Sequence, residues 1–206
     1  MYEWMPEAME QSQKVFQAFS LDWGFKMNEA ATEEEISQCE AELALVLPPS
    51  YREFLLNHNG ARLFRSSAKT QPSSSFWWAD SGVVIFGTKA LIQYRPLIRD
   101  YFLYDDDSSI EDYPSVLPIA YLGHIGTGDF CALNRDKLVD KEHPVLDCDH
   151  ELAPSAWKKA PIASSVEAWL KKMFDCVIEN RSRPEYWFES DIADGLLAES
   201  PDRGQY

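Results

Sequence analysis

The stretch that decides the fold is residues 47–60, which read LPPSYREFLLNHNG. Pro48 or Pro49 suits the start of a helix, because the N–H that proline lacks has no partner in the first helical turn. Apolar residues then recur three and four positions apart and form one helical face, at Tyr51, Phe54 and Leu55. The Asn59-Gly60 pair supplies a left-handed stop. The stretch therefore predicts a short amphipathic helix with a defined start and end.

His58 lies directly before this stop and needs its own interpretation. A histidine can serve as a catalytic base, but a cation is also favourable at the C-terminal end of a helix. The surrounding start and stop signals favour the second role. We therefore interpret the stretch as punctuation of a fold and not as a catalytic motif.

The segments on either side predict a set of helices and strands. We expect helices at 6–19, 32–46, 88–104 and 164–179, with Pro96 breaking or kinking the third. Strands are predicted after Gly60 and at 81–87, 116–122, 129–133 and 143–148. Thr32 with Glu35, and Ser164 with Glu167, have the spacing of capping boxes. Because helices flank a run of strands, the sequence predicts a single α+β domain: a small, mostly antiparallel or mixed sheet packed against N-terminal helices and a long C-terminal helix.

The chain divides into three parts on this reading. Residues 1–27 form an N-terminal extension with a predicted helix, and residues 28–180 form the domain. Residues 181–206 form an acidic, aromatic C-terminal extension.

Charge is the most informative bulk property. The 206 residues hold 19 basic and 34 acidic side chains, which gives a net charge of −15 and a pI near 4.6. Such a field repels nucleic-acid phosphates and anionic lipid, so neither is an expected partner. It favours a basic protein partner, although acidity can also serve solubility alone.

The cysteines and the N-terminus indicate the compartment. The four cysteines are widely spaced with no CxxC motif, as expected of reduced, mostly buried thiols in a cytosolic protein. No signal-peptide pattern and no apolar run long enough to span a bilayer is present, so we expect a cytoplasmic protein.

Five blocks in order resemble the SUKH superfamily, in the branch related to the yeast cell-wall assembly regulator and widespread in bacteria. They run from about Asn28 to Asn180: TEEEISQCEAEL with LPPSYREFLLNHNG, VVIFG, LPIAYLGHIGTGDFCAL, HPVLDCDHE and IASSVEAWL. One position departs from the family pattern. Members tend to have glycine before the Leu-Pro step, where this chain has Ala44, so the first helix of the pair can end differently.

The resemblance implies a compact α+β domain without catalytic activity. In bacteria it implies an immunity protein that binds and neutralises the toxin domain of a polymorphic or contact-dependent system. Such toxins are often nucleases and hence often basic. In fungi it implies an adaptor in cell-wall signalling.

Three possible chemistries are weighed against the residues, and each is disfavoured. The segment GHIGTGDF is rich in glycine, but a phosphate loop needs Lys-Ser/Thr after the last glycine, and Asp129 stands there instead. The cluster DCDHE at 147–151 contains metal-ligand types, but alternation on a strand would scatter them over two faces. No nucleophile motif is present. We therefore expect no enzyme activity, no metal and no cofactor.

The acidic loop at 105–114 is the predicted partner-binding site. Its acidic residues have no Lys or Arg among them, so the loop is either solvated or engaged by a cation-rich partner. Aromatic residues nearby would provide anchors for an interface. The partner-binding residues that we name are Asp105, Asp106, Asp107, Glu111 and Asp112, with Trp78, Tyr104 and Tyr113.

The sequence thus predicts a non-enzymatic binding protein whose leading role is immunity against a cognate, basic toxin. Two alternatives stay open: a regulatory adaptor or scaffold that binds several host proteins, and a small-ligand-sensing domain in which the 116–133 hairpin and the final helix line a pocket.

Overall fold

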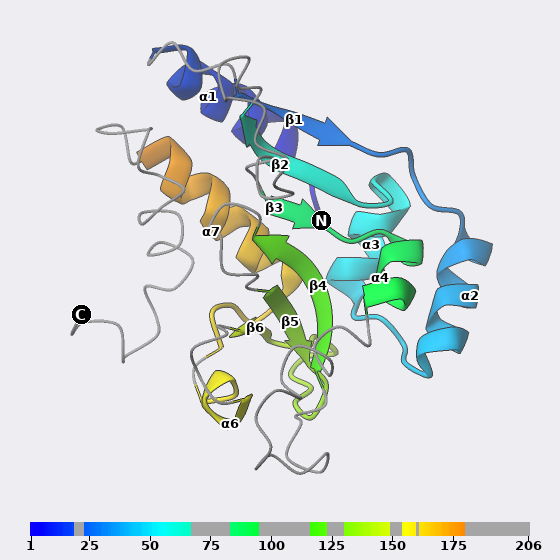
Figure 1. Ribbon diagram of the computed structural model, residues 1–206. Coiled ribbons are helices and arrows are strands. Elements are labelled where there is room, and N and C mark those ends of the chain that lie inside the picture. Colours follow the sequence, from blue (N-terminus) through cyan, green and yellow to red (C-terminus); the bar gives the residue numbers. More distant parts are fainter. Residues whose placement is uncertain are drawn as a thin grey trace, which may run out of the picture.

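A computed structural model of the chain describes residues 1–18, 23–66, 83–94, 116–122, 130–148, 154–159 and 161–179 (Figure 1). Its helices are α1 Met5–Ala18, α2 Glu33–Leu43, α3 Pro49–Asn57, α4 Thr88–Tyr94, α6 Pro154–Trp157 and α7 Val166–Glu179. Its strands are β1 Trp23–Met27, β2 Ala61–Ser66, β3 Val83–Ile85, β4 Val116–Leu122, β5 Phe130–Asn134 and β6 Val145–Cys148.

The described strands form one six-stranded sheet in the order β1-β2-β3-β4-β5-β6. Every neighbouring pair is antiparallel, so each strand pairs with the next one in the chain. The predicted α+β class with an antiparallel sheet is therefore confirmed. The sheet also contains a strand, β1, where the sequence pattern predicted none, because a five-residue segment beginning Trp-Gly gives too short a periodic signal.

The helices lie in two groups around the sheet (Figure 1). Helices α1 and α7 pack on each other, and α7 runs across the face of the sheet, while α2, α3 and α4 cluster beside the end of β3. An aromatic cluster joins the first group to the sheet, because the ring of Phe174 lies 5.1 Å from Phe64, 5.7 Å from Phe25 and 5.7 Å from Trp4. These rings tie α7 to β2, β1 and the segment before α1. The N-terminal stretch thus contributes to the core.

The opening stretch forms α3 as predicted. Tyr51, Phe54 and Leu55 are buried in the core, and Pro48 is the N-cap. The Tyr51 hydroxyl donates to the Phe86 carbonyl oxygen at 2.7 Å, which attaches α3 to the end of β3. His58 is the C-cap residue, as expected, but its backbone is extended; the positive φ follows at Gly60. The helix therefore ends by leaving the helical region, and the left-handed residue comes later.

A bulge in β2 explains how two successive residues can both be buried. Leu63 and Phe64 have no solvent exposure, although neighbours on a regular strand point to opposite faces. The register slips between Gly24 and Lys26 of β1, and Phe64 has a positive φ of 57°. The bulge turns Phe64 toward the aromatic cluster.

The start of α7 corrects one prediction. The Ser165 hydroxyl, not that of Ser164, accepts the Ala168 N–H at 3.1 Å. The Glu167 carboxylate accepts the Trp4 indole N–H at 3.2 Å. The predicted second capping box is therefore wrong by one residue, because Glu167 is used to fix α1 and not to cap its own helix.

The thiols are free and mostly buried, as expected. All four cysteines are free, and Cys39, Cys131 and Cys148 are buried. Among the described residues, no helix has the length and apolar character that a bilayer crossing needs.

Candidate protein-binding surface

Helix α2 presents an acidic face. Residues 28–51 contain six glutamates and no lysine, arginine or aspartate. The apolar side of α2 packs into the core through Ile36, Cys39 and Leu43. The glutamates point away from that side; five are exposed and Glu40 is half-buried. We call this set the α2 acidic face: Glu29, Glu33, Glu34, Glu35, Glu40 and Glu42.

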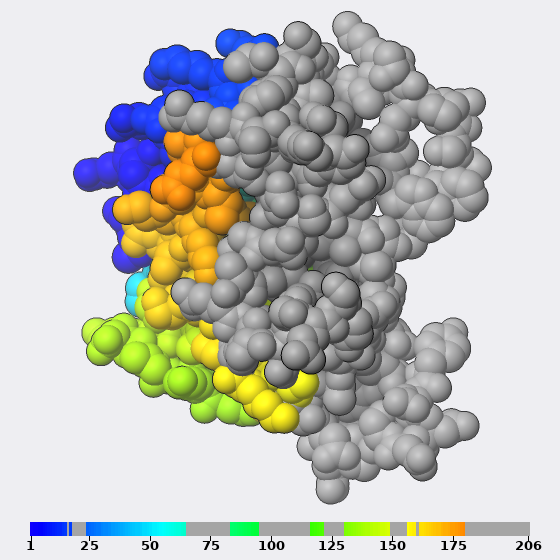
Figure 2. Space-filling model, turned by 90° about the vertical axis from the view of Figure 1, so that its left-hand side faces the viewer, coloured from blue at the N-terminus to red at the C-terminus, as the bar shows by residue number. Residues whose placement is uncertain are grey.

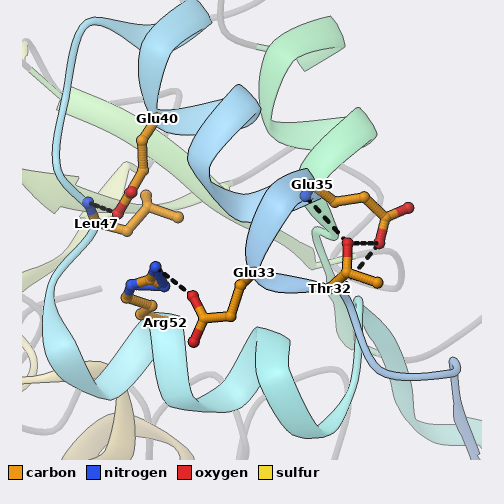
Figure 3. A network of polar contacts seen from close by, with 6 residues as sticks. All are labelled: Thr32, Glu33, Glu35, Glu40, Leu47 and Arg52. Atoms are coloured by element: carbon orange, nitrogen blue, oxygen red, sulfur yellow. Dashed lines mark hydrogen bonds and ion pairs between the residues drawn. The ribbon is translucent and has the colours of Figure 1, made fainter.

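The first turn of α2 is built to hold negative charge. The Thr32 hydroxyl accepts the Glu35 N–H at 3.1 Å, and the Glu35 carboxylate accepts the Thr32 N–H at 2.9 Å, so the predicted capping box is confirmed (Figure 3). Hydrogen bonds from Thr32 lower the pKa of Glu35, with a smaller contribution from Lys89. Glu33, Glu34 and Glu35 also lie at the positive end of the helix dipole.

Arg52 holds α2 against α3. Figure 3 shows its guanidinium reaching from α3 to Glu33, where the N–O distance is 2.5 Å. This ion pair joins the start of α2 to α3. Glu33 therefore serves the helix pair.

The last turn of α2 carries an electrostatic mismatch. Glu40 and Glu42 lie toward the negative end of the helix dipole, and the last turn has no basic residue. Part of this mismatch is compensated, because the Glu40 carboxylate accepts the Leu47 N–H at 2.9 Å (Figure 3).

A pocket of about 610 Å³ opens beside the start of α2. Its walls come from residues 27–30, Glu35, Asn59 and the turn that leads into α4. Glu29, Glu35 and Lys89 are its charged lining residues. The pocket therefore adjoins the α2 acidic face and extends it inward.

The wall of this pocket is held by a corner at Asn59 and Gly60. The Asn59 side chain accepts the Thr88 N–H at 2.7 Å and donates to the Thr88 hydroxyl at 3.2 Å. The Asn59 backbone carbonyl accepts the Asn28 side-chain N–H at 2.8 Å. Glycine is required on both sides of the contact: a Cβ on Gly60 would lie 2.8 Å from the Gly87 nitrogen, and one on Gly87 would lie 2.4 Å from the Asn59 oxygen. The Asn-Gly pair therefore locks the α3–β2 turn onto the start of α4.

Three buried groups of the described residues have raised pKa values. Burial raises the pKa of the Cys39 thiol to about 11 and raises the pKa values of Tyr2 and Tyr51. These groups stay protonated at neutral pH, whereas an acid–base catalyst needs a pKa near the working pH. Within the described ranges, no three His, Cys, Asp or Glu side chains are grouped to hold a metal ion.

The eight partner-binding residues named from the sequence lie outside the described residues. Trp78 falls within 67–82, and the other seven fall within 95–115: Tyr104, Asp105, Asp106, Asp107, Glu111, Asp112 and Tyr113. They stay predictions. The α2 acidic face was not predicted as a site, because its first glutamates were read as capping and dipole residues. The signal that could have found it is the run of 24 residues, 28–51, with six acids and no base.

Comparison with known proteins gives one family. The model of the SMI1 / KNR4 family (SUKH-1) matches residues 30–172 of the chain, well over half of its length. No match was found among the curated proteins. The matched region contains α2, α3 and the Asn59 corner, and it ends within α7.

Proposed function

We propose that this chain, which belongs to the SMI1 / KNR4 family (SUKH-1), is a non-catalytic immunity protein that neutralises a cognate basic toxin by binding it. Family membership supports a binding role with a protein partner. The observation that carries the proposal is the α2 acidic face, whose six glutamates lie in a run of 24 residues, 28–51, that contains no basic residue.

The physical argument is one of charge complementarity. A basic surface placed on the α2 acidic face would supply the cations that the last turn of the helix lacks. Opposite fields also speed encounter and disfavour wrong partners, whereas the contribution of rim charges to affinity is small. We therefore assign the α2 acidic face to recognition and rate of association. The acidic loop at 105–114 and its aromatic neighbours are proposed to add the anchors that hold the partner.

Neutralisation requires that the bound protein block the toxin. A rigid domain can do this by covering the active site. Helix α2 suits the task because Arg52 holds its start and the bond from the Leu47 N–H to Glu40 holds its end. A cytoplasmic location is part of this proposal, since an immunity protein must meet the toxin where the toxin acts.

One further observation favours a second candidate function, the sensing of a small ligand. The pocket beside α2 has room for one, at about 610 Å³, and carries charges of both signs. It lies at the start of α2 and α4, and not between a hairpin and the final helix as the sequence suggested. A thermal-shift screen with zwitterionic metabolites would test this function, and a specific shift lost in Lys89→Ala would support it.

The leading proposal is tested by affinity capture of partner proteins, with three versions of the chain as bait. The first bait is the wild-type chain, and the second carries Glu29→Lys and Glu34→Lys on the α2 acidic face. The third is a matched control with Asp175→Lys and Glu179→Lys on the exposed side of α7. Both variants change the net charge equally, from −15 to −15 + 4 = −11, so they differ only in where the charge is reversed.

We expect one dominant basic protein on the wild-type and control baits, depleted on the α2 variant, and inhibited when mixed with the purified chain. Equal capture by all three baits would remove the α2 acidic face from the interface. A captured partner whose activity is unaffected by the chain would contradict immunity and favour the adaptor role. A bait with Asp105→Lys, Asp106→Lys and Asp107→Lys tests the predicted loop in the same way.

A further inference from the structure

The pocket beside α2 has a rigid frame. The Asn28 N–H donates to the Gly60 oxygen at 3.1 Å, and the Asn59 N–H donates to the Glu29 oxygen at 2.8 Å. These two bonds fix the backbone of the segment that leads into α2. The opposite wall is the start of α4, which packs on α2 (Figure 1) and is held to the Asn59 side chain through Thr88. The charged side chains that line the pocket therefore project from a fixed backbone.

Three charged side chains line the pocket without forming ion pairs with one another. Glu29 precedes α2, Glu35 lies in its first turn, and Lys89 lies in the first turn of α4. Hydrogen bonds from Thr32 lower the pKa of Glu35, and Lys89 adds a smaller contribution, so the Lys89 and Glu35 charges are near enough to interact. Within the part of the chain that the structure describes, no ion pair joins Lys89 to either carboxylate. The pocket therefore offers a ligand two anionic groups and one cationic group, a net charge of 1 − 2 = −1.

The other walls suit a flexible stem that carries charges at its ends. Met27, Ala30 and Ala90 provide apolar lining, against which methylene groups can pack. Asn28 provides an acceptor, because its side-chain N–H donates to the Asn59 carbonyl while its side-chain oxygen has no donor among the described residues. The volume of about 610 Å³ is that of a small-molecule site. The lining thus fits a small ligand with a carboxylate, two cationic groups and a methylene chain between them.

We propose that this pocket binds a free α-amino acid with a cationic side chain, of the arginine and lysine class. The α-carboxylate of the ligand would pair with Lys89, and its two cations would pair with Glu29 and Glu35. Such a ligand has a single net positive charge, which complements the pocket and is attracted by a chain of net charge −15. The inference rests on the ligand-sensing candidate function, whose ligand class it names, and is independent of the immunity proposal.

The test is calorimetric titration of the full chain with L-arginine and with analogues that each lack one charge. Agmatine lacks the carboxylate, N-acetylarginine lacks the α-ammonium, and citrulline replaces the guanidinium by a neutral group of similar shape. We expect L-arginine to bind with a Kd of about 0.1–1 mM, and L-lysine to bind in the same range. Each analogue should bind about five- to tenfold more weakly, because it leaves one charged group of the pocket without a partner.

Paired changes on the protein and on the ligand assign each contact. In Lys89→Ala the preference for arginine over agmatine should disappear, because the group that recognises the carboxylate is gone. In Glu29→Gln the preference for arginine over citrulline or over N-acetylarginine should disappear. Damage to the fold alone would weaken all ligands alike and leave these preferences in place.

Lys171→Ala is the matched control for the lysine variant. Lys171 is exposed on α7, and Figure 2 views the molecule from that side, with α7 in orange beside α1 in blue. Helices α2 and α4 lie on the right-hand side of Figure 1, away from α7. This control should bind every ligand as the wild type does.

The possible outcomes separate this inference from both proposed functions. Arginine that does not bind at about 10 mM would overturn the inference, and so would binding that Lys89→Ala and Glu29→Gln leave unchanged, which places the site elsewhere. Equal binding of citrulline and arginine would overturn the basic ligand class but leave ligand sensing standing. Failure of every zwitterion to bind would remove both. Because no toxin takes part, none of these results decides whether the chain is an immunity protein.

Discussion

The end of α2 yields a prediction with an unusual sign. The helix ends at Ala44, whose φ of 50° and ψ of 44° lie in the left-handed region. Its N–H is shared between the Ala41 and Glu40 oxygens, and the Leu45 N–H donates to the Glu40 oxygen at 3.0 Å. This is a Schellman-type end, for which glycine is the usual residue. Ala44→Gly should therefore stabilise the protein, although Ala→Gly usually destabilises a helix.

The size of the effect is a difference of two terms. Removing the left-handed alanine raises the free energy of unfolding by about 1–2 kcal/mol. The greater freedom of glycine in the unfolded chain lowers it by about 0.4–1 kcal/mol. The net gain is about 0.5–1 kcal/mol, which raises the Tm of a protein of this size by about 2 °C. Urea denaturation with an unchanged m value would give the free energy directly.

A matched control lies three residues earlier. Ala41 is also exposed but lies inside the helix, so Ala41→Gly should destabilise the protein by about 1 kcal/mol. Opposite signs for the two substitutions support the assigned helix end. If both destabilise by similar amounts, Ala44 is not left-handed, and the reasoning about this end is wrong.

Three further predictions concern the other supports of the fold. Gly87→Ala should destabilise the protein by about 1–3 kcal/mol, because its Cβ would lie 2.4 Å from the Asn59 backbone oxygen. The control Gly24→Ala has open space around its Cβ and should change the free energy of unfolding by less than about 0.5 kcal/mol. Equal urea midpoints for the two variants would contradict the account. Glu142→Gln should lower the free energy of unfolding by about 1 kcal/mol, because it removes the charged carboxylate that accepts the Ser50 N–H at the start of α3. An unchanged free energy of unfolding would show that this carboxylate does not hold the helix. The folded-state pKa of Glu35 is lowered from 4.5, so the contribution of its carboxylate to stability is present at neutral pH and is lost as the pH falls below 4.5 through the folded value. The difference in unfolding free energy between wild type and Glu35→Gln should therefore shrink on acidification. A constant or growing difference would refute this.

The sequence predicted most of the elements because their signals are local. The start at Pro48, the apolar spacing of α3 and the Thr32 capping box each depend on residues within one or two turns. The same holds for α7, whose apolar positions recur over 14 residues. Local periodicity and capping chemistry are therefore sufficient to place these helices.

What the sequence did not predict depends on contacts across long separations. The role of Glu167 is set by Trp4, 163 residues away, and not by the serine three positions before it. Asn59 caps the start of α4 from 29 residues away, although its sequence context indicated only a helix stop. The α2 acidic face was missed for a related reason: the same glutamates satisfy a local rule, and only the fold shows which of them are exposed.

The most direct test of the central claim is the association rate of the captured partner, measured by biolayer interferometry on immobilised wild-type chain and on Glu29→Lys/Glu34→Lys. The account predicts that the rate for the wild type falls about tenfold or more between about 50 mM and about 500 mM NaCl. It also predicts that the variant at low salt associates about as slowly as the wild type at high salt. If both chains associate at the same rate at every salt concentration, the α2 acidic face does not recognise the partner, and the claim is contradicted.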